Sequence, residues 1–209
     1  MIIPLKNYKN IIFDLGGVIL NIDYSLTANA FVELGVKDFE RLFSQTKQQH
    51  LFDLLDKGTI SPADFRNEIR KHLHSHLEDY IIDEAWNAML LDLPKARLDF
   101  LKQLKATHHL FLLSNTNEIH INEFNKYLKK HFGIPNLSSY FEKMYLSYKV
   151  GMRKPDVEIF ELVLKENNLQ PHETLFIDDS AQHIEGAKKL GINTYWLDAS
   201  KESILDVFI

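Results

Sequence analysis

The residues of this chain best suited to chemistry are three carboxylates and a neutral polar pair, which follow three short apolar runs. The carboxylates are Asp14, Asp178 and Asp179, and the polar pair is Ser114 with Asn115. A buried strand has no structural reason to end on a charge, because moving a charge out of water is costly unless it is paired or bound to a metal. These positions are therefore candidate functional groups.

For Asp14 taken alone, a structural explanation is equally open, because Asp is a common N-cap at a strand-to-helix turn. Because polar residues follow three separate apolar runs, a functional explanation is favoured over a structural one. If the runs are parallel strands, their carboxyl ends meet at one edge of a sheet, which is where ligands bind in open α/β folds.

Crowded carboxylates indicate a particular chemistry. Carboxylates held close together repel and raise one another's pKa, and a divalent cation relieves that repulsion. Hard oxygen ligands favour Mg²⁺, which is commonly held by one or two carboxylates plus a phosphate. Lys154, in a turn that leads into a helix, is a candidate cationic partner for Asp14 or for a phosphate. The Ser114 hydroxyl and nearby main-chain N–H groups can donate to phosphate oxygens.

This set of groups suits phosphoryl transfer, where positioning and charge neutralisation supply most of the catalysis. A carboxylate such as Asp14 can also act as a covalent nucleophile.

The elements that must position these groups alternate between strands and helices in the second half of the chain. Apolar runs predict strands at residues 11–13, 110–113, 143–146, 174–177 and 193–197, and apolar spacing near 3.6 predicts helices over about 118–130, 156–167 and 181–190. Such alternation is typical of an α/β fold with a doubly wound parallel sheet.

Residues between about 24 and 94 show no strand pattern and predict helices joined by short polar turns. The expected helices cover about 25–34, 39–55, a segment that begins at Ser61-Pro62, and 83–91. Ser at the N-cap followed by Pro at the first helical position is a strong helix start. We therefore predict a core domain made of residues 1–22 and 95–209, with an all-helical cap, residues 23–94, inserted after the first strand.

Composition excludes several classes of function. The chain has 209 residues, of which 45% are hydrophobic and 25% charged, with a formal net charge of −5 and no cysteine. It lacks the basic stripe expected of a nucleic-acid partner, and no apolar run approaches the roughly 18 residues that cross a bilayer. Without cysteine there is no disulfide and no thiolate nucleophile. With no signal peptide at residues 1–6 either, we expect a cytoplasmic protein; the sequence does not indicate an oligomeric state.

Four short motifs then occur in an informative order. They are Phe13-Asp14-Leu15-Gly16-Gly17-Val18, Leu113-Ser114-Asn115-Thr116, Gly151-Met152-Arg153-Lys154-Pro155 and Asp178-Asp179-Ser180. Their order and approximate spacing resemble the four motifs of the haloacid dehalogenase (HAD) superfamily, whose Rossmann-like core carries an inserted helical cap. Within that superfamily, these stretches and Ile184-Glu185-Gly186-Ala187 look closest to the bacterial α-D-glucose-1-phosphate phosphatase group.

The resemblance implies a metal site and a nucleophile. Asp14 would be the residue that becomes phosphorylated and also a ligand of Mg²⁺. The main-chain carbonyl of Gly16 and the carboxylate of Asp179 would be further ligands, and Asp178 would bind directly or through water.

It also implies how the substrate is held. Ser114 and Asn115 would bind the phosphoryl group, and Lys154 would neutralise charge on Asp14 and on the phosphate. The expected substrate is a small phosphate monoester, with a sugar phosphate as the expected class.

One position departs from the superfamily pattern. Most of its phosphatases carry a second Asp two positions after the nucleophile, where it protonates the leaving oxygen, and this chain has Gly16 there. General acid catalysis is typically worth ~10²–10⁴-fold. Asp23 could replace the missing acid, although an N-cap for the helix that follows is the simpler explanation. His183, near the fourth motif, could support the site, whereas Arg153 is expected to be structural or solvent-facing rather than catalytic.

Two other functions stay open. A 2-haloacid dehalogenase would use Asp14 to displace halide, which needs no leaving-group acid, but it would leave Asp178 and Asp179 without a metal to bind. A catalytically weak phosphate-binding regulatory module would explain the loss of the acid at Gly16. The presence of both Asp14 and Lys154 argues against such a module.

Overall fold

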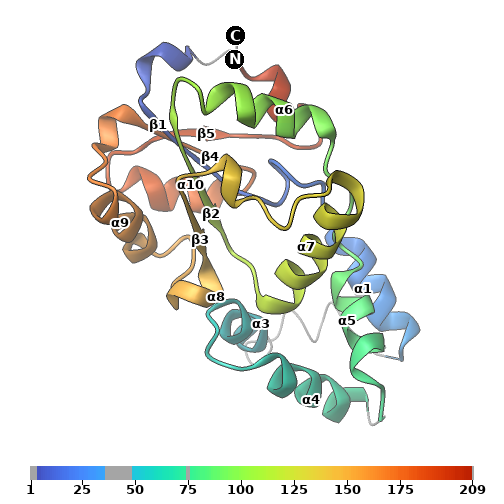
Figure 1. Ribbon diagram of the computed structural model, residues 1–209. Coiled ribbons are helices and arrows are strands. Elements are labelled where there is room, and N and C mark those ends of the chain that lie inside the picture. Colours follow the sequence, from blue (N-terminus) through green and yellow to red (C-terminus); the bar gives the residue numbers. More distant parts are fainter. Residues whose placement is uncertain (1–3, 36–48, 74–75, 209) are drawn as a thin grey trace.

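A parallel β-sheet with helices on both faces forms the larger part of the molecule (Figure 1). The computed structural model describes residues 4–35, 49–73 and 76–208. The described strands are β1 (Asn10–Phe13), β2 (His109–Ser114), β3 (Lys143–Leu146), β4 (Thr174–Asp178) and β5 (Asn193–Trp196). They form one sheet in the order β3-β2-β1-β4-β5, and every neighbouring pair is parallel. The predicted α/β class and doubly wound parallel sheet are confirmed.

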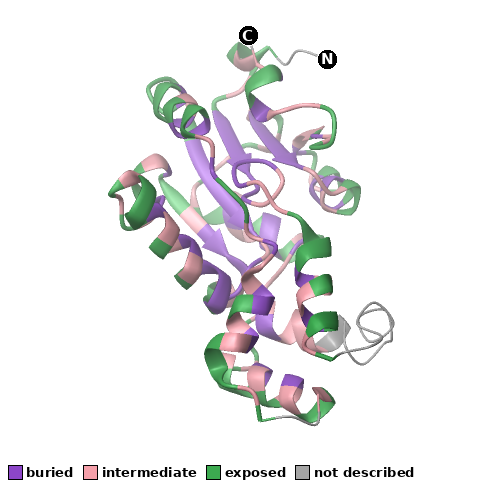
Figure 2. Cartoon of the chain, turned by 90° about the vertical axis from the view of Figure 1, so that its right-hand side faces the viewer, coloured by how far each residue is buried: buried purple, intermediate pink, exposed green. Residues whose placement is uncertain are grey.

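Alternation along the strands explains why both faces of the sheet are covered. Successive side chains of a strand point to opposite faces, so Ile11 and Phe13 join one apolar cluster while Ile12 joins another. The first face packs against α6 (Lys95–Leu104) and α7 (Glu118–Phe132), and the second against α9 (Val157–Glu166) and α10 (Ala181–Lys188). Figure 2 shows the strands largely buried between these helices.

The remaining short elements lie in the connections and near the two ends of the described chain. They are α8 (Ser147–Val150) and the 3₁₀ turns Leu5–Asn7, Ser138–Tyr140, Pro171–Glu173 and Ile204–Asp206.

Helix α6 is an element that the sequence prediction did not include. Its signal is present, because Leu98, Leu101 and Leu104 recur at helical spacing after Pro94, and all three leucines are buried against the sheet.

Four further described helices lie between β1 and α6. They are α1 (Tyr24–Glu33), α3 (Gln49–Asp56), α4 (Pro62–Leu73) and α5 (Asp79–Asn87). We call them the inserted helices. Their apolar faces meet in a separate cluster that includes Phe31, Phe65, Ile82 and Trp86, so this part of the chain buries its own core.

The ends of the inserted helices agree with the sequence in part. Helix α4 begins at Pro62 as predicted: the Ser61 hydroxyl accepts from the Asp64 N–H (3.1 Å), and the Asp64 carboxylate accepts from the Ser61 N–H (3.1 Å). This reciprocal pair is a capping-box arrangement. The helix predicted over about 39–55 is described only from residue 49.

The helix predicted over about 83–91 is wrong at both ends, because α5 runs from Asp79 to Asn87. The chain after it becomes extended and pairs with the segment that leaves β1. Ile22 and Leu90 form an antiparallel bridge, and the Leu91 N–H donates to the Asn21 carbonyl (3.0 Å). The two connections to the inserted helices therefore run side by side.

Within the described part of the chain, no helix has both the length and the apolar character needed to cross a membrane.

Packing of α10 generates a stability prediction. Gly186 is buried, and a Cβ at this position would lie 2.5 Å from the Pro155 carbonyl oxygen and 3.1 Å from Phe160. Overpacking of this kind costs about 1–3 kcal/mol. We expect Gly186→Ala to lower the free energy of unfolding in urea by about that amount, although alanine has the higher helix propensity. Gln182→Ala, at an exposed position of the same helix, is the control; an equal effect of the two substitutions would contradict the packing argument.

Candidate active site

The strand order brings the predicted residues to one edge of the sheet. Asp14 directly follows β1, Ser114 ends β2 and Asp178 ends β4. Since β1 lies between β2 and β4, the structure places Asp14 centrally, with the other two on either side. The Asp14 N–H continues the ladder by donating to the Ile177 carbonyl (2.9 Å).

A buried lysine joins two of these strand ends. The Lys154 ammonium is fully buried, 2.9 Å from Asp14 Oδ1 and 2.6 Å from Asp178 Oδ2. Burial alone would lower the pKa of Lys154, but the charges of Asp14 and Asp178 outweigh burial and raise it. Lys154 therefore stays a cation inside the protein.

Asn115 fixes the backbone that carries this lysine. Its side-chain N–H donates to the Lys154 carbonyl (2.9 Å), and its amide oxygen accepts from the Lys154 N–H (2.9 Å). Both polar atoms of the side chain are thus occupied by Lys154. Its role as a phosphoryl ligand stays a prediction.

The Asp14 carboxylate is held by one oxygen. Oδ1 accepts from the Leu15 N–H (2.7 Å) and contacts Lys154, whereas no donor among the described residues reaches Oδ2. Burial raises the pKa of Asp14, and the charges of Asp178 and Asp179 add to this effect against the attraction of Lys154. An additional cation would be needed to keep Asp14 fully ionised.

Asp178 is, by contrast, saturated with donors. Its Oδ1 accepts from the Ser180 N–H (2.8 Å) and contacts His183 Nδ1 (2.9 Å), and its Oδ2 contacts Lys154. Burial opposes its ionisation, but Lys154 and then His183 outweigh burial and hold the pKa of Asp178 well below its ordinary value. His183, predicted as a possible supporting residue, lies where it orients this carboxylate.

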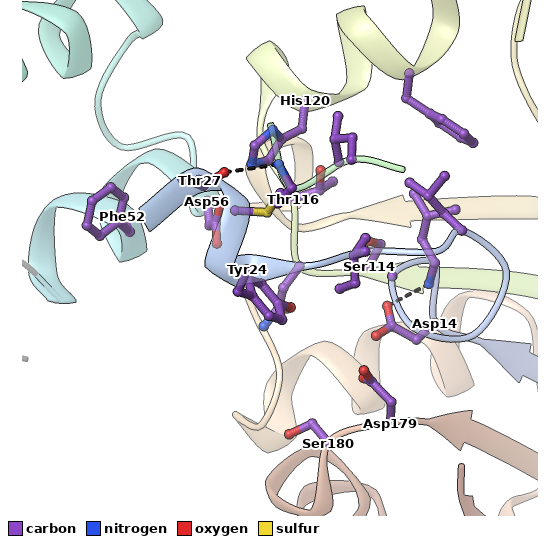
Figure 3. A pocket seen from close by; sticks show the side chains of 18 of the residues that line it. Asp14, Tyr24, Thr27, Phe52, Asp56, Ser114, Thr116, His120, Asp179 and Ser180 are labelled. Atoms are coloured by element: carbon purple, nitrogen blue, oxygen red, sulfur yellow. Dashed lines mark hydrogen bonds between the residues drawn. The ribbon is translucent and has the colours of Figure 1, made fainter. Parts of the chain in front are cut away.

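Asp179 faces Asp14 across the strand ends. Figure 3 shows the two side chains pointing toward one another. Burial, together with the charge of Asp178, raises the pKa of Asp179. The Trp196 indole N–H donates to the Asp179 carbonyl (2.8 Å), and Gly17, at φ 72°, leaves the space that the Asp179 carboxylate fills, since a Cβ there would lie 2.0 Å from Oδ2. Sequence reasoning missed Trp196, whose place opposite Asp178 follows from the β4–β5 register.

These groups fit a hard divalent cation. The carboxylates of Asp14, Asp178 and Asp179 carry more negative charge than Lys154 neutralises. The ligand atoms that these carboxylates offer are oxygens, which Mg²⁺ prefers. Asp14, Asp178 and His183 offer ligand atoms within 4.8 Å of one another, but Asp178 and His183 are occupied with each other. Asp14 and Asp179 have the freer oxygens, which makes them the residues best able to hold the ion. The main-chain carbonyl of Gly16 as a further ligand stays a prediction.

A side chain at Gly16 would require the Ile22 side chain to move. A Cβ at this position would lie 2.9 Å from Ile22 Cδ1. Asp23, the alternative acid, is exposed and caps α1: its carboxylate accepts from the N–H (2.9 Å) and the hydroxyl (2.6 Å) of Ser25. These hydrogen bonds lower the pKa of Asp23, so Asp23 acts as the N-cap rather than as a proton donor.

A cavity of about 870 Å³ extends from Asp14 and Asp179 toward the inserted helices. Figure 3 shows Tyr24 and Asp56 on its side remote from the sheet. The structure also brings His120 and Arg153 to the lining. Arg153 pairs with Asp53 of α3, a contact between the core and an inserted helix that agrees with a structural role.

The sequence did not single out Tyr24, Asp56 or His120. Each lies in a helix or at its end, and each reaches the cavity only through the way the inserted helices pack on the core.

The fold and the site together define a doubly wound α/β enzyme whose active site lies at the carboxyl ends of its strands. The sequence places it more narrowly. Residues 8–191 match the haloacid dehalogenase-like hydrolases, and the chain belongs to that family. The resemblance to the HAD superfamily is thereby confirmed.

Three of its relatives are similar over nearly their whole length. A D-ribitol-5-phosphate phosphatase from Bacteroides thetaiotaomicron is 34% identical over 192 residues, covering 90% of each chain. A HAD family enzyme of the same organism, solved as a magnesium complex, is 38% identical with a TM-score of 0.86, covering 94% of this chain and 96% of that one. A HAD-like family hydrolase from Porphyromonas gingivalis is 30% identical with a TM-score of 0.86, covering 96% of each. The narrower resemblance to glucose-1-phosphate phosphatases stays a prediction.

The buried ammonium generates a prediction about stability and pH. In Lys154→Met, Asp14 and Asp178 are buried without their cation, and breaking a buried ion pair costs roughly 3–5 kcal/mol. We expect the free energy of unfolding in urea, with EDTA present, to fall by about that much at pH 8.

The loss should be smaller at pH 5. In the wild type, the lowered pKa of Asp178 contributes stability above its unfolded value of 3.8. In the variant, uncompensated burial raises the pKa of both carboxyls, so stability falls as the pH rises above about 4. Lys165→Met, at an exposed position of α9, is the control. A loss independent of pH, or no larger than that of the control, would argue against this electrostatic role.

Proposed function

We propose that this protein is a magnesium-dependent phosphatase that hydrolyses a small phosphate monoester through an aspartyl-phosphate on Asp14. The observation that carries the proposal is the state of the Asp14 carboxylate: Lys154 and the Leu15 N–H hold Oδ1, while Oδ2 has no donor among the described residues. Asp14 and Asp179 line the same cavity. The names and magnesium complex of the relatives support the same activity.

In the first step, Asp14 Oδ2 attacks the phosphorus atom. The new Asp14–phosphate bond forms as the bond from phosphorus to the leaving oxygen breaks, and the leaving oxygen takes a proton from solvent water. Ser114, which is buried at the end of β2 and lines the cavity, donates a hydrogen bond to a phosphoryl oxygen. Lys154 balances the negative charge that accumulates around Asp14.

In the second step, water attacks the phosphorus atom of the acyl phosphate. The bond between Asp14 and phosphorus breaks, inorganic phosphate leaves and the carboxylate is restored. The ammonium of Lys154 stays in place through both steps, because its contacts to Asp14 and Asp178 are buried.

A magnesium ion held by Asp14, Asp179 and the Gly16 carbonyl would supply the positive charge that orients the phosphoryl group and lowers the pKa of Asp14. Asp178, saturated by Lys154, His183 and the Ser180 N–H, would contact the ion through water.

The substrate is proposed to be a sugar or polyol phosphate, as the names of two relatives suggest: the D-ribitol-5-phosphate phosphatase and a phosphorylated-carbohydrates phosphatase from Thermotoga maritima. In this proposal, the segment 23–94 is the cap that closes the cavity over the substrate. Without an acid at Gly16, substrates whose leaving oxygen needs little protonation should react fastest.

The proposal predicts that removal of the Asp14 charge abolishes turnover while the fold survives. The wild type should release phosphate from phenyl phosphate with Mg²⁺ and stop when EDTA is added. In Asp14→Asn, kcat should fall on the order of 10⁴-fold or more, as when the nucleophile of other covalent mechanisms is removed. Asp99→Asn, an exposed position on α6, is the control and should keep the wild-type rate.

Three results would reject this function. Magnesium-dependent turnover retained by Asp14→Asn would refute the nucleophile. Halide release from a 2-haloacid in EDTA would point to the dehalogenase instead. If the wild type were inactive on a broad panel of phosphate esters, the result would favour a phosphate-binding module.

A further inference from the structure

The end of the cavity remote from the strand ends has a polar character of its own. Figure 3 shows Asp56, the last residue of α3, on the side of the cavity opposite Asp14, with Phe52 beyond it. Asp56, Phe52, Trp86 and His120 all line this cavity. Aromatic walls with a few polar groups are typical of small-molecule sites.

The Asp56 carboxyl has unused capacity to accept hydrogen bonds. Its Oδ1 accepts from the Asn117 side chain (3.0 Å), and no second donor reaches it from the part of the chain that the structure describes. Burial raises the pKa of Asp56 to about 6, although the Asn117 hydrogen bond opposes the shift. Near neutral pH it is therefore an ionised group with one hydrogen-bond donor, Asn117, among the described residues.

The fold does not need this charge to dock α3. The turn after the helix is held by Lys57, which pairs with Asp156 (3.2 Å), and by close packing of Gly58 on the Tyr148 carbonyl, where a Cβ would lie 2.2 Å away. Leu55, next to Asp56 in the helix, is buried among the other inserted helices. A neutral residue at position 56 could keep the hydrogen bond to Asn117, so the charge has no evident structural task.

His120 offers a second acceptor in the same cavity. Its Nδ1–H donates to the Asn87 side-chain oxygen (2.8 Å), so Nε2 is left as the acceptor. Burial lowers the pKa of His120 to about 3, which keeps the ring neutral. Trp86 stacks on this ring at 4.8 Å and fixes its plane. A ligand that occupies this end must therefore bring hydrogen-bond donors.

Hydroxyl groups are the donors that best match the rest of the lining. The cavity lining also includes the hydroxyl-bearing residues Tyr24 and Thr116. A chain of hydroxyl groups can both donate to the carboxylate and accept from such groups, whereas an ammonium can only donate.

We propose that Asp56 is a specificity-determining residue, which accepts a hydrogen bond from a hydroxyl at the end of the substrate remote from the phosphate. This inference rests on the proposed phosphatase activity. It predicts that the preferred substrates are polyol or sugar phosphates. The phosphate would lie at Asp14, and a distal hydroxyl would lie at the end of the cavity that carries Asp56 and His120.

The test compares three esters of equal carbon number and the same kind of leaving oxygen. Ribitol 5-phosphate carries hydroxyls along its chain and n-pentyl phosphate carries none; 5-aminopentyl phosphate carries a terminal ammonium. We expect the wild type to prefer ribitol 5-phosphate over n-pentyl phosphate in kcat/KM. In Asp56→Asn the ratio should fall about 10- to 100-fold, the range for a lost hydrogen bond to a charged group. In the control Asp99→Asn the ratio should stay at the wild-type value.

Stability separates a functional role of Asp56 from a structural one. The pKa of Asp56 is higher in the folded chain than its ordinary 3.8, so its ionisation lowers stability as the pH rises through about 6. Asp56→Asn should therefore be at least as stable as the wild type in urea at pH 8. A structural role predicts a less stable variant.

The outcomes distinguish the two proposals. A wild type inactive on these esters and on phenyl phosphate refutes the proposed function, and the inference with it. An active wild type whose preference is unchanged by Asp56→Asn overturns the inference alone. A preference for 5-aminopentyl phosphate that depends on Asp56 overturns the assignment of a hydroxyl.

Discussion

The structure depends on one buried ammonium. Lys154 lies within 2.9 Å of Asp14 and 2.6 Å of Asp178, and all three side chains are buried. Without this cation, two carboxylates would face each other in a low dielectric, where uncompensated charge is severely unfavourable. The ammonium favours the ionised form of Asp14 at the end of the central strand and opposes the effect of burial on its pKa. Asn115 holds the lysine backbone in turn, so the second and third motifs act as one support for the first.

This electrostatic centre requires the sheet order. A parallel sheet with β1 between β2 and β4 places their carboxyl ends side by side, and residues 100 or more positions apart meet there. The negative charge of the carboxylates that Lys154 does not neutralise would attract a divalent cation. The inserted helices supply the opposite wall of the cavity, with a separate core that includes Phe65 and Trp86. In our proposal, the strand ends carry the chemistry, whereas the inserted helices contribute Asp56 to substrate selectivity.

The sequence was sufficient for the elements whose signal is local. Asp14 and Asp178 could be predicted to lie near each other because buried strands and their polar ends are visible in short windows, and parallel strands end at one edge. The end of α5 could not be predicted in this way, because Leu90 pairs with Ile22 after the helix ends, and this contact depends on the tertiary fold. Asp56 was missed for the same reason: nothing within its own helix shows that it lines a cavity.

The most direct test of the central claim is whether phosphate is transferred to Asp14. The wild type should be mixed with substrate and Mg²⁺, quenched in acid during turnover, digested and analysed by mass spectrometry. The account predicts a phosphoryl group on the peptide that contains Asp14, lost on treatment with hydroxylamine and absent when EDTA replaces Mg²⁺. A turning-over enzyme with no phosphorylated peptide, or with the phosphoryl group on another residue, would contradict it.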